Sequence, residues 1–577
     1  MKVVGLEVHN YRNLDGITLS FHDDCNFLVG ENNLGKSNIL ALLNTLFSRR
    51  AFQEDDFFDI TKPIQVILKL KLANVEIGHF QDLFTATDYH LIALTCLQSN
   101  PDGDIEFLHT ETGTNIPPGV IRQIHFVYYN SLRNPITEIN FDKTRGVGRF
   151  LTNLISAYLK NTGFTDKDFL DGTKVQALIT ALNANISRIK SFNDFGIAAA
   201  ADDDPESLLT KVVVLKDAKG EALSRAGYGI QFLILVTLSV LERIQTICQE
   251  RRDSGIFQDE QTGKKAISLV LGLDEPEIHL HPYMQRSLLK YLNEVINNKN
   301  TQFSALIKDL FGIDYFVGQI LVVTHSPNVL LEDYRQIIRL YSEKGKVKVI
   351  SGLLLKLDRQ QEKHLLLNFP FIKEAFFSRS AIFVEGDSEY SSIPIFTKTT
   401  TGNDLDDLGI CVIKANGSAV PLLLVIAGLF GIPSVGLTDK DDGSKPPTMP
   451  NHYETTKRNF EDEFVSMLLD SGRESVLRQV LTSYDPQGVN RTLDPKALNN
   501  TALHKFGAIT TPYQANLKLA AIQTTNLLDL RAFYLTWFTI NKSYPLGRHL
   551  GQTLSADQIP TPYKDIIAEA LRLVQNV

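Results

Sequence analysis

The sequence predicts an α/β protein built from two α/β units, with a helical segment inserted into the first. Three observations carry this prediction. A glycine-rich loop joins an apolar run to a helical pattern near the N-terminus, and a second apolar run near residue 270 ends in acidic residues. In the C-terminal half, short apolar runs alternate with helical patterns and are followed by carboxylates. Strand-length apolar runs that alternate with helices are typical of parallel sheets covered by helices.

The composition is that of an ordinary folded protein. The 577 residues are 43% hydrophobic and 21% charged, which excludes a disordered or collagen-like chain. A prior of about 150 residues per domain predicts three to four domains. The net charge of −8 argues against coating nucleic acid through bulk positive charge, but it leaves local contacts open. The four cysteines form no CxxC pair, so neither a zinc knuckle nor a disulfide framework is predicted.

Residues 419–437 contain no charged side chain and are nominally long enough to span a bilayer. Pro421, Gly428, Gly431 and Pro433 interrupt this run, so it predicts a buried helix at 422–429 and a strand at 433–437. The first residues carry polar side chains too early for a signal peptide. The sequence therefore predicts a cytoplasmic protein that does not enter a membrane.

The first unit begins with predicted strands at 2–8 and 25–29. The second of these runs into GENNLGKS, which matches the GxxxxGKS pattern, and a helical pattern follows it. In such a loop, backbone N–H groups surround a phosphate, Lys36 reaches the β- and γ-phosphates, and Ser37 binds Mg²⁺. We therefore expect ATP with one Mg²⁺ here. The predicted nucleotide-binding residues of this segment are Gly30, Asn32, Asn33, Gly35, Lys36, Ser37 and Asn38.

Two later strands are expected to complete this site. The strand predicted at 268–273 ends in DEPEIHLHP, so Asp274 fits the acid that holds Mg²⁺ and Glu275 the residue that polarises the attacking water. The strand predicted at 320–323 ends in THSP, where His325 is placed to sense the γ-phosphate. A single histidine after a strand usually only completes a turn, but the neighbouring motifs favour a functional role.

A third segment, LSRAGYG, is a Ser/Gly-rich turn before an apolar helix and predicts a second anion site with Ser224 and Gly227 as its contacts. Together with the NYRN segment near the start, these motifs resemble the ATPase heads of the RecF-like and SMC-like branch of the ABC superfamily. The resemblance implies that Arg12 also belongs to the nucleotide site. It further implies that the LSRAGYG turn meets ATP bound to a second subunit, although Arg225 and Ala226 depart from the usual LSGGQ.

The interval between Ser37 and Ser224 is too short for the long coiled coils of cohesin-like proteins. Within it, Leu and Ile recur at helical spacing over residues 150–191, which predicts a pair of inserted helices. The apolar stripe serves either ordinary packing or dimerisation. Residues 198–205, which contain three consecutive aspartates, are predicted to be a surface loop with solvated acids.

The second unit places carboxylates at strand ends. A strand predicted at 381–384 ends in Glu385, and Glu389 returns to the same face four residues later. The next strand delivers Asp439 and Asp441. Acids that converge in this way repel one another, so divalent cations are expected to compensate them. Ligands that are all oxygen favour two Mg²⁺ or Mn²⁺ ions over zinc.

In this order, and with Lys542 far downstream, these residues resemble a Toprim domain. An ATPase head followed directly by a Toprim domain resembles the OLD (overcoming lysogenisation defect) nucleases. The resemblance implies that the metal ligands of this domain are Glu385, Glu389, Asp439, Asp441 and Glu461. Glu463 is the alternative to Glu461. Lys542 would stabilise negative charge on the phosphate that reacts, or else be an exposed loop lysine, and Glu385 is also a candidate general base.

The predicted organisation is an ATPase head in two parts (1–149 and 211–370), a helical insertion (150–210) and a Toprim domain (371–577). The predicted function is that of an ATP-hydrolysing, metal-dependent endonuclease that cuts double-stranded DNA by a two-metal mechanism. The resemblance implies a homodimer or higher homo-oligomer, and anti-phage defence with a partner protein or a retron. Two alternatives stay open: a DNA-binding repair or loading ATPase with a non-catalytic Toprim domain, and an RNA (tRNA) nuclease.

Overall fold

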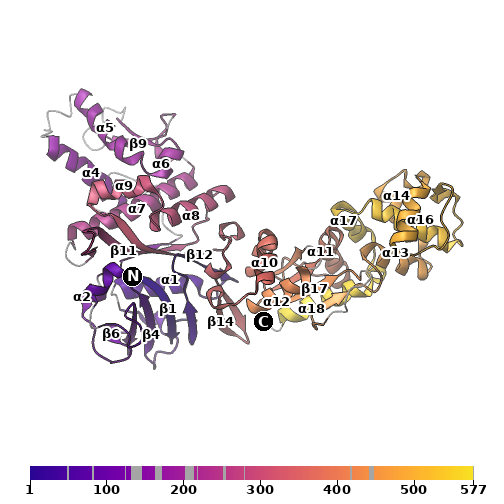
Figure 1. Cartoon of the computed structure of the whole chain (residues 1–577), viewed down its shortest axis with the longest axis horizontal. Helices are drawn as coiled ribbons and strands as arrows, with labels where there is room; N and C mark the ends of the chain where they lie inside the picture. The colour runs from indigo at the N-terminus through magenta and orange to yellow at the C-terminus, as the bar shows by residue number, and fades with distance from the viewer. Residues whose placement is uncertain are drawn as a thin grey trace. The chain divides into compact units, whose positions relative to one another are not determined.

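A computed structural model describes the chain except for residues 49–50, 81–82, 122, 124, 131–145, 163–171, 202–212, 218, 226, 251–254, 279, 416–418, 441–447 and 576–577. The chain forms two compact units (Figure 1). The first comprises Met1–Leu340 and Val347–Leu354, and the second comprises Tyr341–Lys346 and Leu355–Val577. The sequence predicts the second unit from residue 371, whereas the structure also assigns helix α10 (Arg359–Ile372) to it because α10 packs against a helix of that unit, α12 (Ala419–Leu429).

The first unit contains two large sheets. One is antiparallel with the order β2-β1-β4-β5-β6, and the other has the order β10-β11-β12-β3-β13-β14 with β7 beside β11. The strands of the antiparallel sheet are β1 (Lys2–His9), β2 (Ile17–Ser20), β4 (Ile64–Lys71), β5 (Leu91–Gln98) and β6 (Glu106–His109). Those of the mixed sheet are β3 (Cys25–Gly30), β7 (His125–Tyr129), β10 (Ile256–Gln258), β11 (Lys265–Asp274), β12 (Tyr315–Val323), β13 (Ile337–Glu343) and β14 (Lys346–Ser351).

The central strands of the mixed sheet determine where the site lies. Strands β7, β11, β12, β3 and β13 are parallel, so their carboxyl ends meet at one edge. The predicted strands at 25–29, 268–273 and 320–323 are confirmed as β3, β11 and β12, which are buried almost throughout. The helices around them are α1 (Lys36–Ser48), α2 (Pro118–Ile121), α7 (Tyr228–Glu250), α8 (Pro282–Ile296) and α9 (Thr301–Phe311).

The insertion is helical, as its periodicity predicts. It contains α4 (Gly146–Thr162), α5 (Gly172–Ile186) and α6 (Lys190–Asp194), and α4 packs against α7. The prediction of a surface loop at 198–205 is wrong for its first residues, because β8 (Ala198–Ala201) pairs antiparallel with β9 (Val213–Lys216). An alanine run carries little strand signal by itself, and its partner is distant in sequence. The three aspartates lie outside the described residues.

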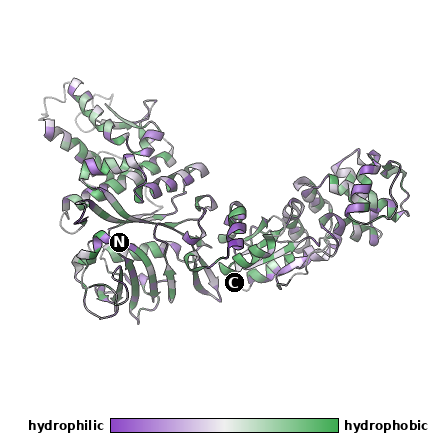
Figure 2. Ribbon diagram, in the orientation of Figure 1, coloured by the Kyte–Doolittle hydropathy of each residue, from purple (hydrophilic) through white to green (hydrophobic). Residues whose placement is uncertain are grey.

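Helix α7 is the longest apolar helix of the described chain. Its stretch Gly229–Gln249 is long and apolar enough to cross a membrane by length and composition, but 78% of the most apolar window is buried inside the structure. Figure 2 shows that hydrophobic residues also dominate the long strands near this helix. Such burial is typical of a core helix in a soluble domain.

The second unit has a parallel four-stranded sheet in the order β16-β15-β17-β18. The apolar run at 419–437 forms a largely buried helix, α12, and then β17, which confirms the prediction of a buried helix and strand. The strands are β15 (Ser380–Val384), β16 (Ile410–Lys414), β17 (Ser434–Thr438) and β18 (His452–Glu454), with a small pair β19 (Thr492–Leu493) and β20 (Leu517–Lys518). The remaining helices are α11 (Asp387–Thr401), α13 (Phe460–Asp470), α14 (Glu474–Tyr484), α15 (Pro495–Leu498), α16 (Leu527–Ile540), α17 (Tyr544–Thr553) and α18 (Thr561–Gln575).

Candidate active sites

The glycine-rich loop between β3 and α1 has the backbone that its sequence requires. Gly35 has φ = 90°, and a Cβ there would lie 2.6 Å from Asn13 Oδ1. Only glycine fits such a position without strain. The Lys36 side chain is buried, and its Nζ donates to Gly30 O (3.0 Å) and Glu31 O (2.5 Å). Burial lowers the pKa of Lys36 to about 8, so an anionic phosphate beside this amine would favour its charged form.

Ser37 and Asp274 meet at the carboxyl edge of the sheet. Ser37 Oγ donates to Asp274 Oδ1 at 2.8 Å, which brings the two predicted Mg²⁺ ligands of the nucleotide site together. The other oxygen, Asp274 Oδ2, accepts from the Tyr128 hydroxyl at 3.2 Å. Tyr128, at the end of β7, is a contact that the sequence did not reveal, because β7 carries no recognisable motif.

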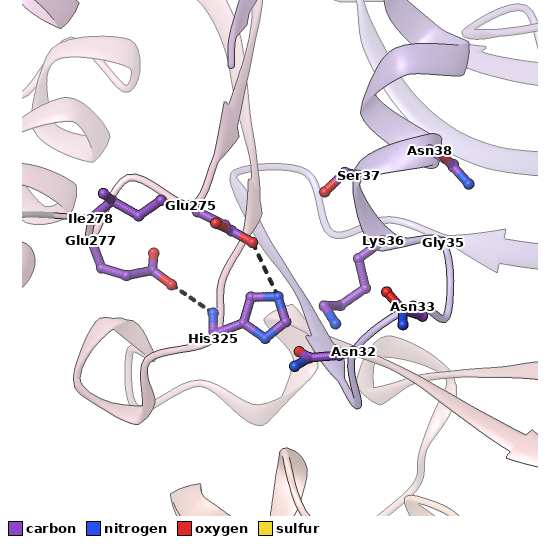
Figure 3. A pocket seen from close by; sticks show the side chains of 10 residues that line it. All are labelled: Asn32, Asn33, Gly35, Lys36, Ser37, Asn38, Glu275, Glu277, Ile278 and His325. Atoms are coloured by element: carbon purple, nitrogen blue, oxygen red, sulfur yellow. Dashed lines mark hydrogen bonds and ion pairs between the residues drawn. The ribbon is translucent and has the colours of Figure 1, made fainter. Parts of the chain in front are cut away.

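Glu275 and His325 form the second pair of the site. His325 Nε2 lies 3.2 Å from Glu275 Oε1, and the imidazole lies between Glu275 and Lys36 (Figure 3). Burial and the Lys36 charge lower the pKa of His325, which favours the neutral ring. Glu277 Oε1 accepts from the His325 backbone N–H (2.6 Å) and from Thr324 Oγ1 (2.8 Å), so Glu277 fixes the turn. This role of Glu277 was not predicted, although the residue lies within the DEPE segment.

Most of the predicted nucleotide-binding residues line one open cavity of about 780 Å³. Its lining consists of Asn32, Asn33, Gly35, Lys36, Ser37, Asn38, Glu275, Glu277, Ile278 and His325. Arg12 is not in this lining, but it donates to Asn38 Oδ1 (2.6 Å) and to Asp56 Oδ1 (2.8 Å). It therefore orients Asn38, which lines the cavity. Gly227 lies just before α7 and is not among the described residues of this lining, and the Ser224 side chain is outside the described part of the chain.

The carboxylates of the second unit come from separate elements. Glu385 follows β15 and Asp439 follows β17, and the Asp439 backbone N–H donates to Glu385 Oε2 at 3.1 Å. Glu389 lies in the first turn of α11 and Glu461 in the first turn of α13; they are 2% and 1% exposed. Lys542, in the turn between α16 and α17, places Nζ 3.3 Å from Glu461.

The electrostatics of this second site are dominated by buried negative charge. Burial raises the pKa of Asp439 to about 8, and Glu389, Glu385 and Glu461 add to the rise. Burial likewise raises the pKa of Glu389 to about 7. Burial lowers the pKa of Lys542, but the facing carboxylates outweigh it and raise the value to about 12. One ammonium therefore faces several carboxylates and cannot neutralise them all.

A divalent cation fits this donor set. Every candidate ligand is a carboxylate, and Glu389 Oε2 is buried without a hydrogen-bond partner among the described residues. The described His, Cys, Asp and Glu side chains do not by themselves close a metal-binding group of three or more, and Asp441 lies outside the described residues. The existing acids thus suit the ion, but the described part of the chain does not contain a complete coordination shell.

The structure distinguishes the two acids of α13. Glu463 accepts from Thr456 Oγ1 (2.6 Å) and from the Lys457 backbone N–H (2.7 Å), which holds it against a loop. Glu461 instead faces Lys542. Two further residues at this site were not predicted: Asp387 and Lys414 line the cavity and form an ion pair of 2.7 Å. Neither stands in a pattern that distinguishes it from an ordinary surface charge.

The fold and the two sites define a class of protein, a P-loop ATPase joined to a Toprim domain. The family described as "AAA ATPase domain" matches residues 1–115 and 122–330, and the family "Overcoming lysogenization defect protein-like, TOPRIM domain" matches residues 376–441. The chain therefore belongs to the AAA ATPase domain family and carries an OLD-like Toprim domain after its ATPase domain.

Individual proteins and solved structures are similar to the chain over different shares of its length. An OLD nuclease from Thermus scotoductus is 22% identical over 504 residues, which cover 79% of this chain and 85% of that protein. The DNA replication and repair protein RecF of Staphylococcus aureus is 50% identical, but only over 46 residues, or 8% of this chain and 12% of RecF. The solved C-terminal region of the Burkholderia pseudomallei OLD protein is 20% identical, with a TM-score of 0.22, and covers 34% of this chain and 99% of that structure.

Proposed function

We propose that the protein is an ATP-hydrolysing, divalent-metal-dependent DNA endonuclease that acts as a homodimer. The observation that carries the nuclease assignment is a carboxylate cluster opposite Lys542, in which Glu389 and Glu461 are buried and Glu385 and Asp439 are partly buried. Burying several carboxylates together is costly unless the site is used with cations. A Toprim domain that served only as a scaffold would have no need of this cluster or of a lysine directed at it.

In the ATPase half, the proposed roles follow from the contacts. Lys36 and the loop N–H groups hold the phosphates, and Ser37 and Asp274 hold one Mg²⁺. Glu275 orients and deprotonates the attacking water, and His325, neutral and paired with Glu275, reports the γ-phosphate. Gly227, before α7, is not among the described residues that line the cavity of its own chain, which supports the use of this turn on the nucleotide of a second subunit.

In the Toprim half, Glu385, Glu389, Asp439, Asp441 and Glu461 would hold two Mg²⁺ or Mn²⁺ ions. When bound, these ions would polarise the scissile phosphate and stabilise the charge that develops on it. Lys542 keeps its charge at neutral pH and is positioned to donate to a non-bridging phosphate oxygen. Glu385 is more accessible than the buried Glu389, so it suits a proton-accepting role.

A role in anti-phage defence, with a partner protein or a retron, is the biological setting that the OLD resemblance suggests. Cytoplasmic localisation is proposed with it. Both rest on the family alone.

Plasmid cleavage tests the nuclease assignment. Replacing Glu385 with Ala should abolish cleavage in Mg²⁺ or Mn²⁺ and leave ATP turnover intact, because the two sites lie in different units. Asp404→Ala, which removes a partly exposed acid of the same unit, is the matched control and should cut like the parent. Undiminished cutting by the Glu385→Ala protein would overturn the assignment.

A further inference from the structure

Two exposed tyrosines stand beside the Toprim cavity and have no role in the chemistry described so far. Tyr390 in α11 is 38% exposed, and Tyr544 at the start of α17 is 43% exposed. Their ring centroids are 6.1 Å apart with an interplanar angle of 48°. Rings at this distance and tilt pack against each other and do not form a slot between them. The two rings of Tyr390 and Tyr544 therefore form one exposed aromatic surface, which we call the step.

The step is tied to the reacting groups through the chain. Tyr390 directly follows Glu389, and it lies three residues after Asp387, which lines the cavity, so both face the same side of α11. Tyr544 directly follows Ser543, which lines the cavity together with Lys542. The two tyrosines therefore lie in the same short segments as Asp387 and Lys542, the charged residues that line the cavity.

Close packing between α11 and α17 holds the step in place. A Cβ at Gly547 would lie 2.3 Å from Ser388 O and from Ser391 Oγ, so no side chain can separate the helices there. A Cβ at Gly551 would lie 2.9 Å from Ile395 Cβ. Since the helices approach closely through these glycines, the backbones that carry Tyr390 and Tyr544 are held next to each other.

The cavity and the step differ in chemistry. The described residues of the cavity lining are polar and include no aromatic ring: they are Glu385, Gly386, Asp387, Lys414, Asp439, Lys542 and Ser543. The step offers flat aromatic faces. A nucleotide matches this combination, because it joins a phosphate, which suits the cavity, to a flat base, which suits a ring. A base inside a duplex already stacks on its neighbours, so only an unpaired base can use the step fully.

On the basis of the proposed nuclease function, we propose that Tyr390 and Tyr544 form a stacking subsite for an unpaired base next to the scissile phosphate. The preferred substrate class is then single-stranded DNA, or DNA with an unpaired segment at the cut. This refines the expectation of a fully double-stranded substrate. The tyrosines act as positioning residues. They contact the base through their ring faces, because stacking does not require the hydroxyl groups.

The test measures binding and cleavage of one sequence as a labelled single strand and as a duplex, with full-length protein. In fluorescence anisotropy with Ca²⁺ as the only divalent ion, Tyr390→Ala/Tyr544→Ala should bind the single strand about tenfold to a hundredfold more weakly than the parent. The affinity of this variant for the duplex should fall much less. With Mn²⁺, the KM for the single strand should rise while kcat at saturation changes little. The double phenylalanine variant should retain parental binding.

Tyr89→Ala is the matched control, because it removes a tyrosine that is 62% exposed in the ATPase unit. It should bind like the parent. The proposal is overturned if the double alanine variant, folded by circular dichroism and thermal melting, binds the single strand as tightly as the parent. It is equally overturned if single strand and duplex weaken alike, or if the phenylalanine variant loses as much as the alanine variant. If the parent protein binds DNA but never cleaves it, the nuclease function is contradicted. The binding measurements still test the stacking proposal in that case.

Discussion

The two sites of this protein are built in opposite ways. In the ATPase unit, the acidic side chains have partners within the site: Asp274 accepts from Ser37 and Tyr128, and Glu275 pairs with His325. In the Toprim unit, Glu389, Asp439 and Glu461 share one lysine, and Glu389 Oε2 has no hydrogen-bond partner among the described residues. The difference shows that Asp274 and Glu275 are held by protein donors in the ATP site, whereas the nuclease site gathers more carboxyl groups than Lys542 can neutralise, so protons or cations must balance them.

The largest effect is expected in the ATP site. Glu275→Gln keeps the shape and removes the proton acceptor, so ATP turnover should fall by about a hundredfold, the contribution typical of a positioned general base. Nucleotide binding, followed with a fluorescent ATP analogue, should persist because Lys36 and Ser37 are intact. Glu260→Gln, an exposed glutamate of the same unit, serves as the control. Turnover at the parental rate in Glu275→Gln would refute the assignment of Glu275.

The next prediction concerns the stability of the Toprim unit and not its catalytic activity. Lys542→Ala removes an ammonium that faces Glu461, Glu389 and Asp439, so the protein in chelator should unfold more easily. The Lys542 side chain is 35% exposed, so a loss of about 1–2 kcal/mol is expected instead of the larger cost of a fully buried pair. Urea unfolding measures it, with Lys398→Ala as the exposed-lysine control. Addition of Mn²⁺ should recover part of the loss, and a parental midpoint in chelator would contradict the account.

The structure agrees with the predictions from sequence wherever a local pattern determines the element. The apolar runs that became β3, β11, β12, β15 and β17 are buried on both faces, and each delivers its polar residues at the sheet edge. The predictions fail where contacts depend on distant pairing. Tyr128 reaches Asp274 only because β7 lies beside β11, and β8 exists only because β9 pairs with it.

A smaller effect concerns pH. The pKa values of Asp439 and Glu389 are raised, so the folded metal-free protein binds more protons than the unfolded chain between about pH 4 and pH 8. The stability that these protons supply is complete at low pH and is lost as pH rises through the folded values, by roughly 1.4 kcal/mol per pH unit for each proton. Because cations compete with protons, Mn²⁺ should raise the melting temperature more at about pH 8.5 than at about pH 6. An equal rise at both would contradict the raised values.

The smallest effect is expected at Tyr128. Its hydroxyl donates to Asp274 at 3.2 Å, and Ser37 donates to the other oxygen of that carboxylate. Tyr128→Phe should therefore weaken Mg²⁺-dependent ATP turnover only a few-fold, because Ser37 still donates to this carboxylate and water can replace the lost donor, so the effect stays well below the roughly 1.5–3 kcal/mol of a hydrogen bond to a charged group. Steady-state ATPase assays over a Mg²⁺ series measure this. A loss as large as that of Glu275→Gln would mean that Asp274 depends on Tyr128.

The charge imbalance of the Toprim site is tested most directly by titration calorimetry with Mn²⁺ in the absence of nucleotide. The account predicts that the parent binds Mn²⁺, that Asp439→Asn loses this binding, and that Lys36→Ala in the ATP site retains it. If Asp439→Asn bound Mn²⁺ as tightly and with the same stoichiometry as the parent, the carboxylate cluster would not be the metal site.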